Sequence, residues 1–489
     1  MVTVIVIQMM LTPSLVAAVG IVELFEWRFD DIARECELFL GPKGFDAVQV
    51  SPVAESPQNE NISYFDRYEP ISYIIKSRSG DENEFEDMCH RCRKAGISIY
   101  VDVVINNMSK HDSNNLSEQS IVKGLAGSEA DLRRKNYPAV PYKAEHFNQC
   151  NGTICTRIVT DNASWQRNSE YMGRHDLDQS QPYVRQRIAE FLNRLIALGA
   201  SGFYVSHAKY IWPEDLKAIY SQLNDTIFDQ QRPFIYHEYE KYDDPKFEEY
   251  LQLGLITEFG HYRELHSCFS GRVALKWLSN YGTAWMLLPS ENVISFIDDK
   301  NTQRTGIFSY REPSAKAYKM AIAFTLAWGY GTPRIMSSYR FSQAGDTFGP
   351  PRYENGSTIH VEPFPSTCTY GWICEHRWYQ TFGMIDFANA AQGTNVTNFW
   401  HNDNNQISFC RGDAAFIVFN MEDDDLFQRF QTCLPQGLYC DVATGYKLGN
   451  YCSGRTVSVD YDGTADVYIG ADADDGFLAI HRNSRVDRL

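Results

Sequence analysis

The chain has 489 residues, enough for one large domain and one or two smaller ones around well-filled cores. Its 62 acidic and 45 basic side chains give a formal net charge of −17, which repels nucleic acid and anionic lipid and favours a neutral or cationic partner. The twelve cysteines show no CxxC…CxxC or CxxC…HxxxH spacing, so no zinc site is indicated.

The N-terminus is uncharged and mostly apolar over residues 1–22 and contains the small-residue stretch Leu15-Val-Ala-Ala18. We predict a signal peptide over residues 1–19 and a secreted, extracellular protein. A membrane-spanning helix is the weaker alternative, because Gln8, Pro13 and Ser14 interrupt the stretch. Secretion also fits the cysteine content and the many Asn-x-Ser/Thr sequons. The sequons lie at Asn61, Asn107, Asn115, Asn151, Asn162, Asn224, Asn355 and Asn395.

Buried strands alternate with helices along most of the chain. Apolar runs predict strands over residues 21–27, 45–52, 97–105, 202–206, 233–238 and 293–298, and helical periodicity predicts helices over 30–40 and 182–198. This α/β alternation over ~370 residues favours a closed parallel barrel. Polar residues at the strand ends would then meet on one rim: Asp102, Asn106, Ser206, Glu238, Asp298 and Asn301.

Two segments depart from the alternation. Residues 107–174 are rich in Asn, Ser and Gly and predict an excursion domain inside the barrel, which would comprise residues 20–106 and 175–391. From residue 392 to 489 short alternating strands with turns predict a separate all-β domain.

Several motifs of the chain look like family signatures. They include Glu23-Leu-Phe-Glu-Trp27, Ala47-Val-Gln-Val-Ser-Pro52, Gly331-Thr-Pro-Arg-Ile-Met-Ser-Ser-Tyr-Arg340 and Cys374-Glu-His-Arg-Trp378. With these motifs the chain resembles the animal α-amylases of glycoside hydrolase family thirteen from about residue 21 to the C-terminus. The resemblance implies a (β/α)8 TIM barrel, an excursion domain after the third strand and a C-terminal β-sandwich.

The motifs that carry the family's chemistry are altered here. By the resemblance, Glu238 keeps the position of the general acid/base, but Ser206 stands at the nucleophile position and Asn301 at that of the third carboxylate. Asn107 and Lys300 replace two histidines that contact the sugar. A retaining glycosidase needs two carboxylates ~5–5.5 Å apart, and a serine hydroxyl cannot offset the positive charge on the sugar. We therefore predict a pseudoenzyme of carbohydrate metabolism or recognition.

Alternatives to this prediction remain. A Ser206–His207 pair would restore a nucleophile, although neighbouring residues of a strand point to opposite faces. Inversion would need Asp298 or Asp299 as base opposite Glu238. At the level of function, the alternatives are an active or weak α-amylase that hydrolyses internal α-1,4-glucosidic bonds, and a structural or interaction glycoprotein.

The resemblance also implies ion sites. Calcium would be held by the side chains of Asn106 and Asp176 and by the main-chain carbonyls of Arg167 and Tyr210, an oxygen set suited to this cation. Chloride is not expected. Arg334 is retained from the family's chloride site, but Tyr204 and Asp299 replace an arginine and an asparagine.

Sugar contacts and disulfides follow the same comparison. Tyr64, Phe65, Tyr68 and Lys209 match residues that contact the glucan in the family, so we expect an α-glucan or another glycan as ligand, a protein partner as the alternative, and a monomer. The resemblance implies the disulfides Cys36–Cys92, Cys368–Cys374 and Cys440–Cys452, with Cys155 as a substitute partner for Cys150. Cys89, Cys268, Cys410 and Cys433 receive no partner from the sequence.

Overall fold

The computed structural model describes residues 20–110, 120–151, 154–155, 162–240, 247–305, 308–311, 313–343 and 345–486. The predicted signal peptide, residues 1–19, lies outside the described residues, as does the sequon at Asn115. Among the residues described, no helix has the length and apolar character needed to cross a membrane.

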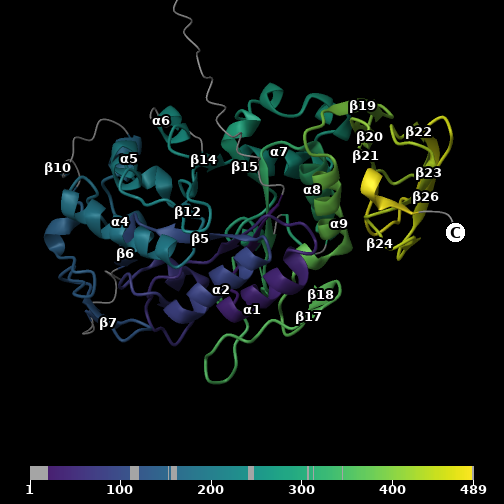
Figure 1. The fold of residues 1–489 in the computed structure, drawn as a ribbon. Coiled ribbons are helices and arrows are strands. Elements are labelled where there is room, and N and C mark those ends of the chain that lie inside the picture. Colours follow the sequence, from purple (N-terminus) through teal and green to yellow (C-terminus); the bar gives the residue numbers. More distant parts are fainter. Residues whose placement is uncertain are drawn as a thin grey trace, which may run out of the picture.

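Eight parallel strands close into a barrel at the centre of the molecule (Figure 1). In chain order they are β1 (Ile21–Leu24), β2 (Ala47–Val50), β5 (Ser98–Val104), β12 (Gly202–Ser206), β13 (Phe234–His237), β14 (Leu255–Thr257), β15 (Val293–Phe296) and β16 (Thr332–Ser337). Sequential strands are neighbours, and β1 closes the ring by pairing with both β2 and β16. The predicted (β/α)8 barrel is confirmed.

Helices cover the outside of the barrel and pack on its strands. They include α1 (Phe29–Glu35), which continues as a π-helix over Cys36–Leu40, α2 (Glu82–Lys94), α4 (Pro182–Ala197), α5 (Pro213–Tyr220), α7 (Phe259–Phe269), α8 (Ala315–Trp328) and α9 (Tyr379–Ala390). Local signals explain their starts. Asp81 accepts hydrogen bonds from the first turn of α2, and Pro182 occupies the first position of α4, where its missing N–H costs nothing.

The excursion follows β5, the third strand of the barrel. Its two ends pair with each other, because β6 (Asn107–Lys110) runs antiparallel to β11 (Arg174–Asp176). Between them β7 (Ile121–Lys123) pairs with β8 (Glu129–Asp131). Asn106 and Asp176 therefore lie side by side where the excursion leaves and re-enters the barrel.

The C-terminal domain is all-β and has two layers. The inner sheet has the order β19 (Val396–His401), β20 (Gln406–Arg411), β21 (Ala415–Asn420) and β28 (Phe477–His481). Alternate residues of β20 and β21 divide between two cores: Phe409 and Phe419 join the barrel core, whereas Phe416 and Val418 face the outer layer. That outer layer contains β22 (Leu426–Gln431) paired with β27 (Thr464–Ile469), and β23 (Gly437–Cys440) between β26 (Thr456–Val459) and β29 (Arg485–Val486).

The disulfides Cys36–Cys92, Cys368–Cys374 and Cys440–Cys452 are confirmed. A further disulfide joins Cys410 to Cys433, which the sequence left without partners. Cys410 is the last but one residue of β20 and faces the outer layer, and Cys433 follows β22 (Leu426–Gln431). Cys89 and Cys268 are buried free thiols. The backbones of Cys150 and Cys155 pair across β9 (Cys150–Asn151) and β10 (Ile154–Cys155), but their side chains, and so their disulfide, lie outside the described residues.

Candidate functional site

The carboxyl ends of the barrel strands bring four polar side chains together on one rim. Asp102 comes from β5, Ser206 ends β12, Glu238 follows β13 and Lys300 follows β15. Asp102, Ser206 and Lys300 are buried, and Glu238 is half-buried. Parallel strands all point their carboxyl ends to the same rim of a closed barrel, so residues nearly 200 positions apart in sequence form one site.

The side chain of Ser206 is hydrogen-bonded to that of Asp102. Its hydroxyl donates to Asp102 Oδ1 at 2.6 Å, and the Tyr68 hydroxyl donates to Asp102 Oδ2 at 2.9 Å. The strand ends at Ser206, and His207 takes a left-handed backbone conformation (φ 59°). The alternation that was expected to turn His207 away therefore does not extend to it, and its ring lies 6.4 Å from that of Tyr68. The Ser206 hydroxyl donates its hydrogen bond to Asp102, so the geometry favours Asp102 over His207 as its partner.

Lys300 lies between the two carboxylates of the site. Its Nζ is 3.7 Å from Asp102 Oδ2 and 4.0 Å from Glu238 Oε1. The same ammonium lies over the rings of Tyr68, at 4.6 Å, and Tyr204, at 5.1 Å. The lysine side chain is only 3% exposed, so it fills the centre of the site.

The charges in the site stabilise one another. Burial alone would raise the pKa of Glu238, but the Lys300 ammonium, His207 and the backbone N–H of His207, which donates to Glu238 Oε2 at 3.0 Å, together lower it to about 2. Burial opposes the charge on Lys300, yet Glu238 and Asp102 raise its pKa well above the usual value. Glu238 and Lys300 are therefore both ionised at neutral pH.

Asn301 lies at the exposed edge of the site. The Tyr64 hydroxyl donates to its Oδ1 at 3.4 Å, and its own backbone N–H donates to Asp299 Oδ1 at 2.9 Å. Asp298 is buried and accepts from the Gln303 amide at 2.8 Å. Both aspartates that were considered as bases for inversion thus hold the local chain, Asp299 in a turn and Asp298 in the barrel wall.

Aromatic side chains line the approach to the site on a 3-10 helix, η2 (Tyr64–Tyr68). The rings of Tyr64 and Phe65 are 4.3 Å apart; Tyr64 is buried and Phe65 half-buried. Phe348, which the sequence analysis did not single out, is 71% exposed and bridges to Ser63 at the start of this helix. Its position depends on a contact between segments 285 residues apart, which no local motif signals.

Lys209 and Asn107 take different environments. The Lys209 ammonium lies 5.3 Å from the centre of the Tyr210 ring and is half-buried. Asn107 is buried, and its amide donates to the carbonyls of Tyr68 and Met108 at 3.2 and 2.8 Å. The glycan-accepting nitrogen of this sequon is therefore enclosed in the fold. Roles of both residues in ligand binding stay predictions.

The residues expected to hold calcium fit a hard cation. Asn106 Oδ1 and Asp176 Oδ1 are buried and have no hydrogen-bond partner within the described chain. The two residues are adjacent, because the N–H of Leu177 donates to the Asn106 carbonyl at 2.9 Å. The other carboxylate oxygen of Asp176 accepts from the Asn148 amide at 2.8 Å. Buried oxygen atoms without donors are what a Ca²⁺ ion requires.

Arg334, which the sequence comparison matched to a chloride-binding arginine, lies next to the carboxylate of Glu23. Arg334 Nε lies 3.8 Å from Glu23 Oε2, and its Nη1 donates to Gln49 Oε1 at 3.1 Å. Its guanidinium also lies over the Tyr204 ring at 5.3 Å. Both members of the ion pair are buried, so a carboxylate of the chain itself neutralises Arg334.

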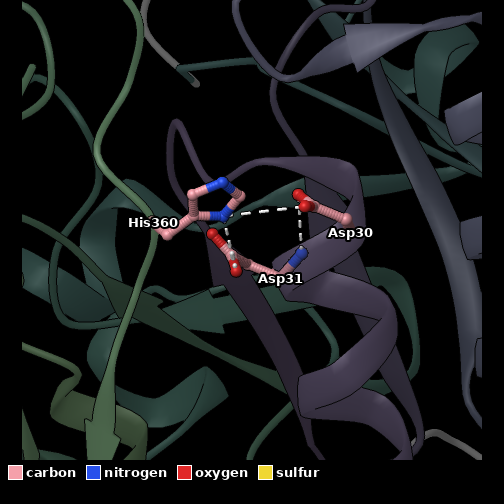
Figure 2. Close-up of side chains that lie close together, drawn as sticks. All are labelled: Asp30, Asp31 and His360. Carbon is pink, nitrogen blue, oxygen red and sulfur yellow. Dashed lines mark hydrogen bonds and ion pairs between the residues drawn. The ribbon is translucent and has the colours of Figure 1, made fainter. Parts of the chain in front are cut away.

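A second polar cluster lies outside the rim site (Figure 2). His360 Nδ1 is 3.2 Å from Asp31 Oδ1 and 3.6 Å from Asp30 Oδ2. Asp31 also accepts from the Val361 N–H at 3.0 Å and from Arg34 at 2.7 Å. Because these carboxylates already have partners, the cluster ties the start of α1 to the segment at His360 and needs no metal.

A closed (β/α)8 barrel with an excursion after the third strand, a C-terminal β-sandwich and a polar rim site defines an α-amylase-type protein. Comparison with known families agrees. Residues 39–270 match the model of the α-amylase catalytic domain, and residues 397–483 match that of the α-amylase C-terminal all-β domain.

Known relatives extend the match to nearly the whole chain. The chain is 44% identical over 478 residues to the alpha-amylase-related protein of Drosophila atripex, covering 95% of this chain and 94% of the relative. It is 43% identical over 479 residues to the protein of the same name in Drosophila simulans, with the same coverage. Among solved structures, α-amylase I of Eisenia fetida is 35% identical with a TM-score of 0.86, covering 94% of this chain and 97% of that chain. A mutant of that enzyme in complex with maltohexaose matches with a TM-score of 0.87. The chain therefore belongs to the α-amylase family.

Proposed function

We propose that this chain is a secreted member of the α-amylase family that binds α-glucans at the barrel rim without hydrolysing them. The observation that carries the proposal is the Lys300 ammonium, which lies between Asp102 and Glu238, while Asp102 also accepts the hydrogen bond of the Ser206 hydroxyl. Hydrolysis with retention needs a negative group at the attacking position, whereas this site has the neutral Ser206 hydroxyl at that position and a buried ammonium close to both remaining carboxylates.

Neither oxygen near Lys300 replaces the missing nucleophile. If Ser206 attacked the sugar, the product would be another glycosidic bond, as stable as the one that was broken, so no reactive intermediate would form. Asp102 is fully buried and accepts from both Ser206 and Tyr68. Its carboxylate thus serves to hold the rim residues in place.

The charge state of Glu238 also opposes catalysis. A general acid must carry a proton at the working pH, but Glu238 has a pKa of about 2 beside Lys300. The Lys300 charge also repels the cationic transition state. Two unit charges 4 Å apart repel by about 4 kcal/mol at an effective dielectric constant of about 20, which slows a reaction about a thousandfold.

Glucan binding is supported by the aromatic surface and by the relatives. Phe65 and Phe348 remain accessible beside the rim, and aromatic rings of this kind offer flat apolar faces next to polar groups. A mutant of the similar α-amylase I of Eisenia fetida was solved in complex with maltohexaose. A neutral polysaccharide also suits a chain of net charge −17.

Secretion and calcium complete the proposal. The described chain contains four disulfides, which form and persist in oxidising compartments, and the sequon residues Asn61, Asn162, Asn224, Asn355 and Asn395 are exposed. Asn106 and Asp176, with the carbonyls of Arg167 and Tyr210, would hold Ca²⁺. The ion would supply positive charge that joins the excursion to the barrel, as a structural element.

Calorimetric titration with maltohexaose, combined with an assay of reducing ends released from starch, tests the proposal. We expect measurable binding without hydrolysis, and about tenfold weaker binding for Phe65→Ala combined with Phe348→Ala. Phe364→Ala is the matched control, because Phe364 is also an exposed phenylalanine. Release of reducing ends by the native chain at ~1–10³ s⁻¹ would refute the loss of catalysis. No binding at millimolar maltohexaose would instead favour a structural glycoprotein.

A further inference from the structure

The outer layer of the C-terminal domain exposes two aromatic rings side by side. Phe427 on β22 is 75% exposed, Tyr468 on β27 is 55% exposed, and the two residues are direct partners in the antiparallel register. Side chains of directly opposite residues leave the same face of a sheet with their Cβ atoms about 5 Å apart. In Figure 1, β22 is labelled at the outer edge of this domain, away from the barrel.

The other face of the same two strands explains why these rings point outward. Leu426 and Phe430 of β22, with Val467 and Ile469 of β27, pack into the core against the inner sheet. The strands therefore have one buried face and one free face, and the aromatic pair lies on the free face. Large exposed aromatics rimmed by polar groups mark a binding surface more often than a random surface position.

The polar groups around the aromatic pair form hydrogen bonds and ion pairs with one another. The Tyr468 hydroxyl donates to Asp425 Oδ2 at 2.9 Å, and Asp425 Oδ1 accepts from the Ala471 N–H at 2.9 Å. One row along the sheet, Arg429 pairs with Asp466 at 3.1 Å and with Asp460 at 2.6 Å. The Tyr468 ring is thus held in position, and the nearest carboxylates all have hydrogen-bond or ion-pair partners.

This combination selects the kind of ligand. An anionic polymer is disfavoured because carboxylates outnumber the one guanidinium beside the rings. A basic peptide would need free carboxylates, yet Asp425 and Asp466 already have partners. A neutral polyhydroxylated chain fits both features, since the C–H face of a sugar packs on an aromatic ring while its hydroxyls reach the carboxylate oxygens.

We propose that Phe427 and Tyr468 form a second α-glucan-binding platform, separate from the rim site. The choice of α-glucan rests on the proposed function of that rim site. Two sites on one chain hold a polymeric glucan far more tightly than either site alone, by a factor that reaches 10²–10⁴ when both engage the same polymer. The platform thereby directs the protein to insoluble or branched glucan, whereas short oligosaccharides use the rim.

Adsorption to insoluble starch tests the platform. The double variant Phe427→Ala, Tyr468→Ala should adsorb at least about tenfold more weakly than the native chain. Its thermal unfolding should be unchanged, because both side chains are exposed. Tyr461→Ala is the matched control, since Tyr461 is 88% exposed in the same domain but lies in the turn between β26 and β27. Adsorption of the double variant equal to that of the control overturns the proposal.

A rim variant separates this proposal from the proposed function. The double variant Phe65→Ala, Phe348→Ala should lose maltohexaose affinity and keep part of its adsorption to starch. Adding the platform substitutions Phe427→Ala and Tyr468→Ala should abolish this remaining adsorption. If the rim substitutions alone abolish adsorption, the platform is wrong and the rim function stands. If the native chain binds neither starch nor maltohexaose, both the proposed glucan-binding function and the platform are wrong. Binding of polylysine that depends on Phe427 and Tyr468 would assign the surface to a basic partner instead.

Discussion

Replacing Lys300 with methionine tests the electrostatics of the rim site. Methionine keeps an unbranched side chain of similar length but removes the ammonium that lies 3.7 Å from Asp102 and 4.0 Å from Glu238. Two buried or half-buried carboxylates then face each other without a counter-charge. Breaking a buried ion pair by removing one partner typically costs about 3–5 kcal/mol.

The shift of the Glu238 pKa gives an independent magnitude. Burial raises this pKa, but Lys300, His207 and the His207 N–H lower it from 4.5 to about 2, and each unit corresponds to about 1.4 kcal/mol. The shift is therefore worth roughly 3 kcal/mol. Since the His207 N–H remains in the variant, we expect Lys300→Met to lose about 2–3 kcal/mol at pH 7.

The lowered pKa of Glu238 determines how the stability difference between the native chain and Lys300→Met changes with pH. A group whose folded pKa is lowered stabilises the fold above its unfolded pKa, and this contribution disappears as the pH falls through the folded value. For Glu238 the window runs from about pH 4.5 to pH 2. The difference between native chain and variant should thus be full at pH 7 and shrink toward pH 2.

Thermal unfolding from pH 2 to pH 8 measures this difference. We expect the variant to melt about 2–3 °C lower at pH 7, because an unfolding entropy of about 2.1 cal/mol/K per residue over 489 residues gives about 1 °C per kcal/mol. Lys209→Met, which removes a half-buried lysine of the same rim, should change the melting temperature by less than about 1 °C. Equal melting temperatures of Lys300→Met and the native chain at pH 7, or a gap that persists at pH 2, would refute the reasoning.

Three further predictions concern ions and glycans. Chelation of calcium should lower the melting temperature of the native chain reversibly and leave Asp176→Asn unaffected; an identical response of both contradicts the calcium site. Because Glu23 neutralises Arg334, added chloride should not alter the stability of the native chain, but it should stabilise the variant Glu23→Gln. A melting temperature of the native chain that depends on chloride would contradict this pairing. In mass spectrometry of the secreted protein, Asn107→Gln should leave the glycan mass unchanged because Asn107 is buried, and Asn355→Gln should remove one glycan; a mass loss for Asn107→Gln shows that glycosylation precedes burial.

The sequence predicted the architecture because barrel strands carry strong local signals. Apolar runs such as residues 97–105 and 202–206 indicate strands buried on both faces, and these strands appear as β5 and β12. Two barrel strands, β14 and β16, were not predicted from the sequence. β14 has only three residues, Leu255–Thr257, and β16 contains Pro333, so neither has the length or composition of a typical buried strand.

The site was only partly predictable for a related reason. Motif positions placed Ser206, Glu238 and Lys300 at strand ends, and their meeting on one rim follows from parallel topology. The direction of the Lys300 side chain does not follow, because its burial between Asp102 and Glu238 depends on contacts across the barrel. Cys410–Cys433 was missed in the same way, since this pair joins the two layers of a sandwich whose packing no spacing rule describes.

Turnover of soluble starch by the purified native chain, measured beside its maltohexaose affinity, is the most direct test of the central claim. We predict saturable maltohexaose binding and no release of reducing ends above the uncatalysed background. Hydrolysis at a rate typical of enzymes, ~1–10³ s⁻¹, would show that a site with Lys300 between its carboxylates still performs the family's chemistry, and would contradict the account.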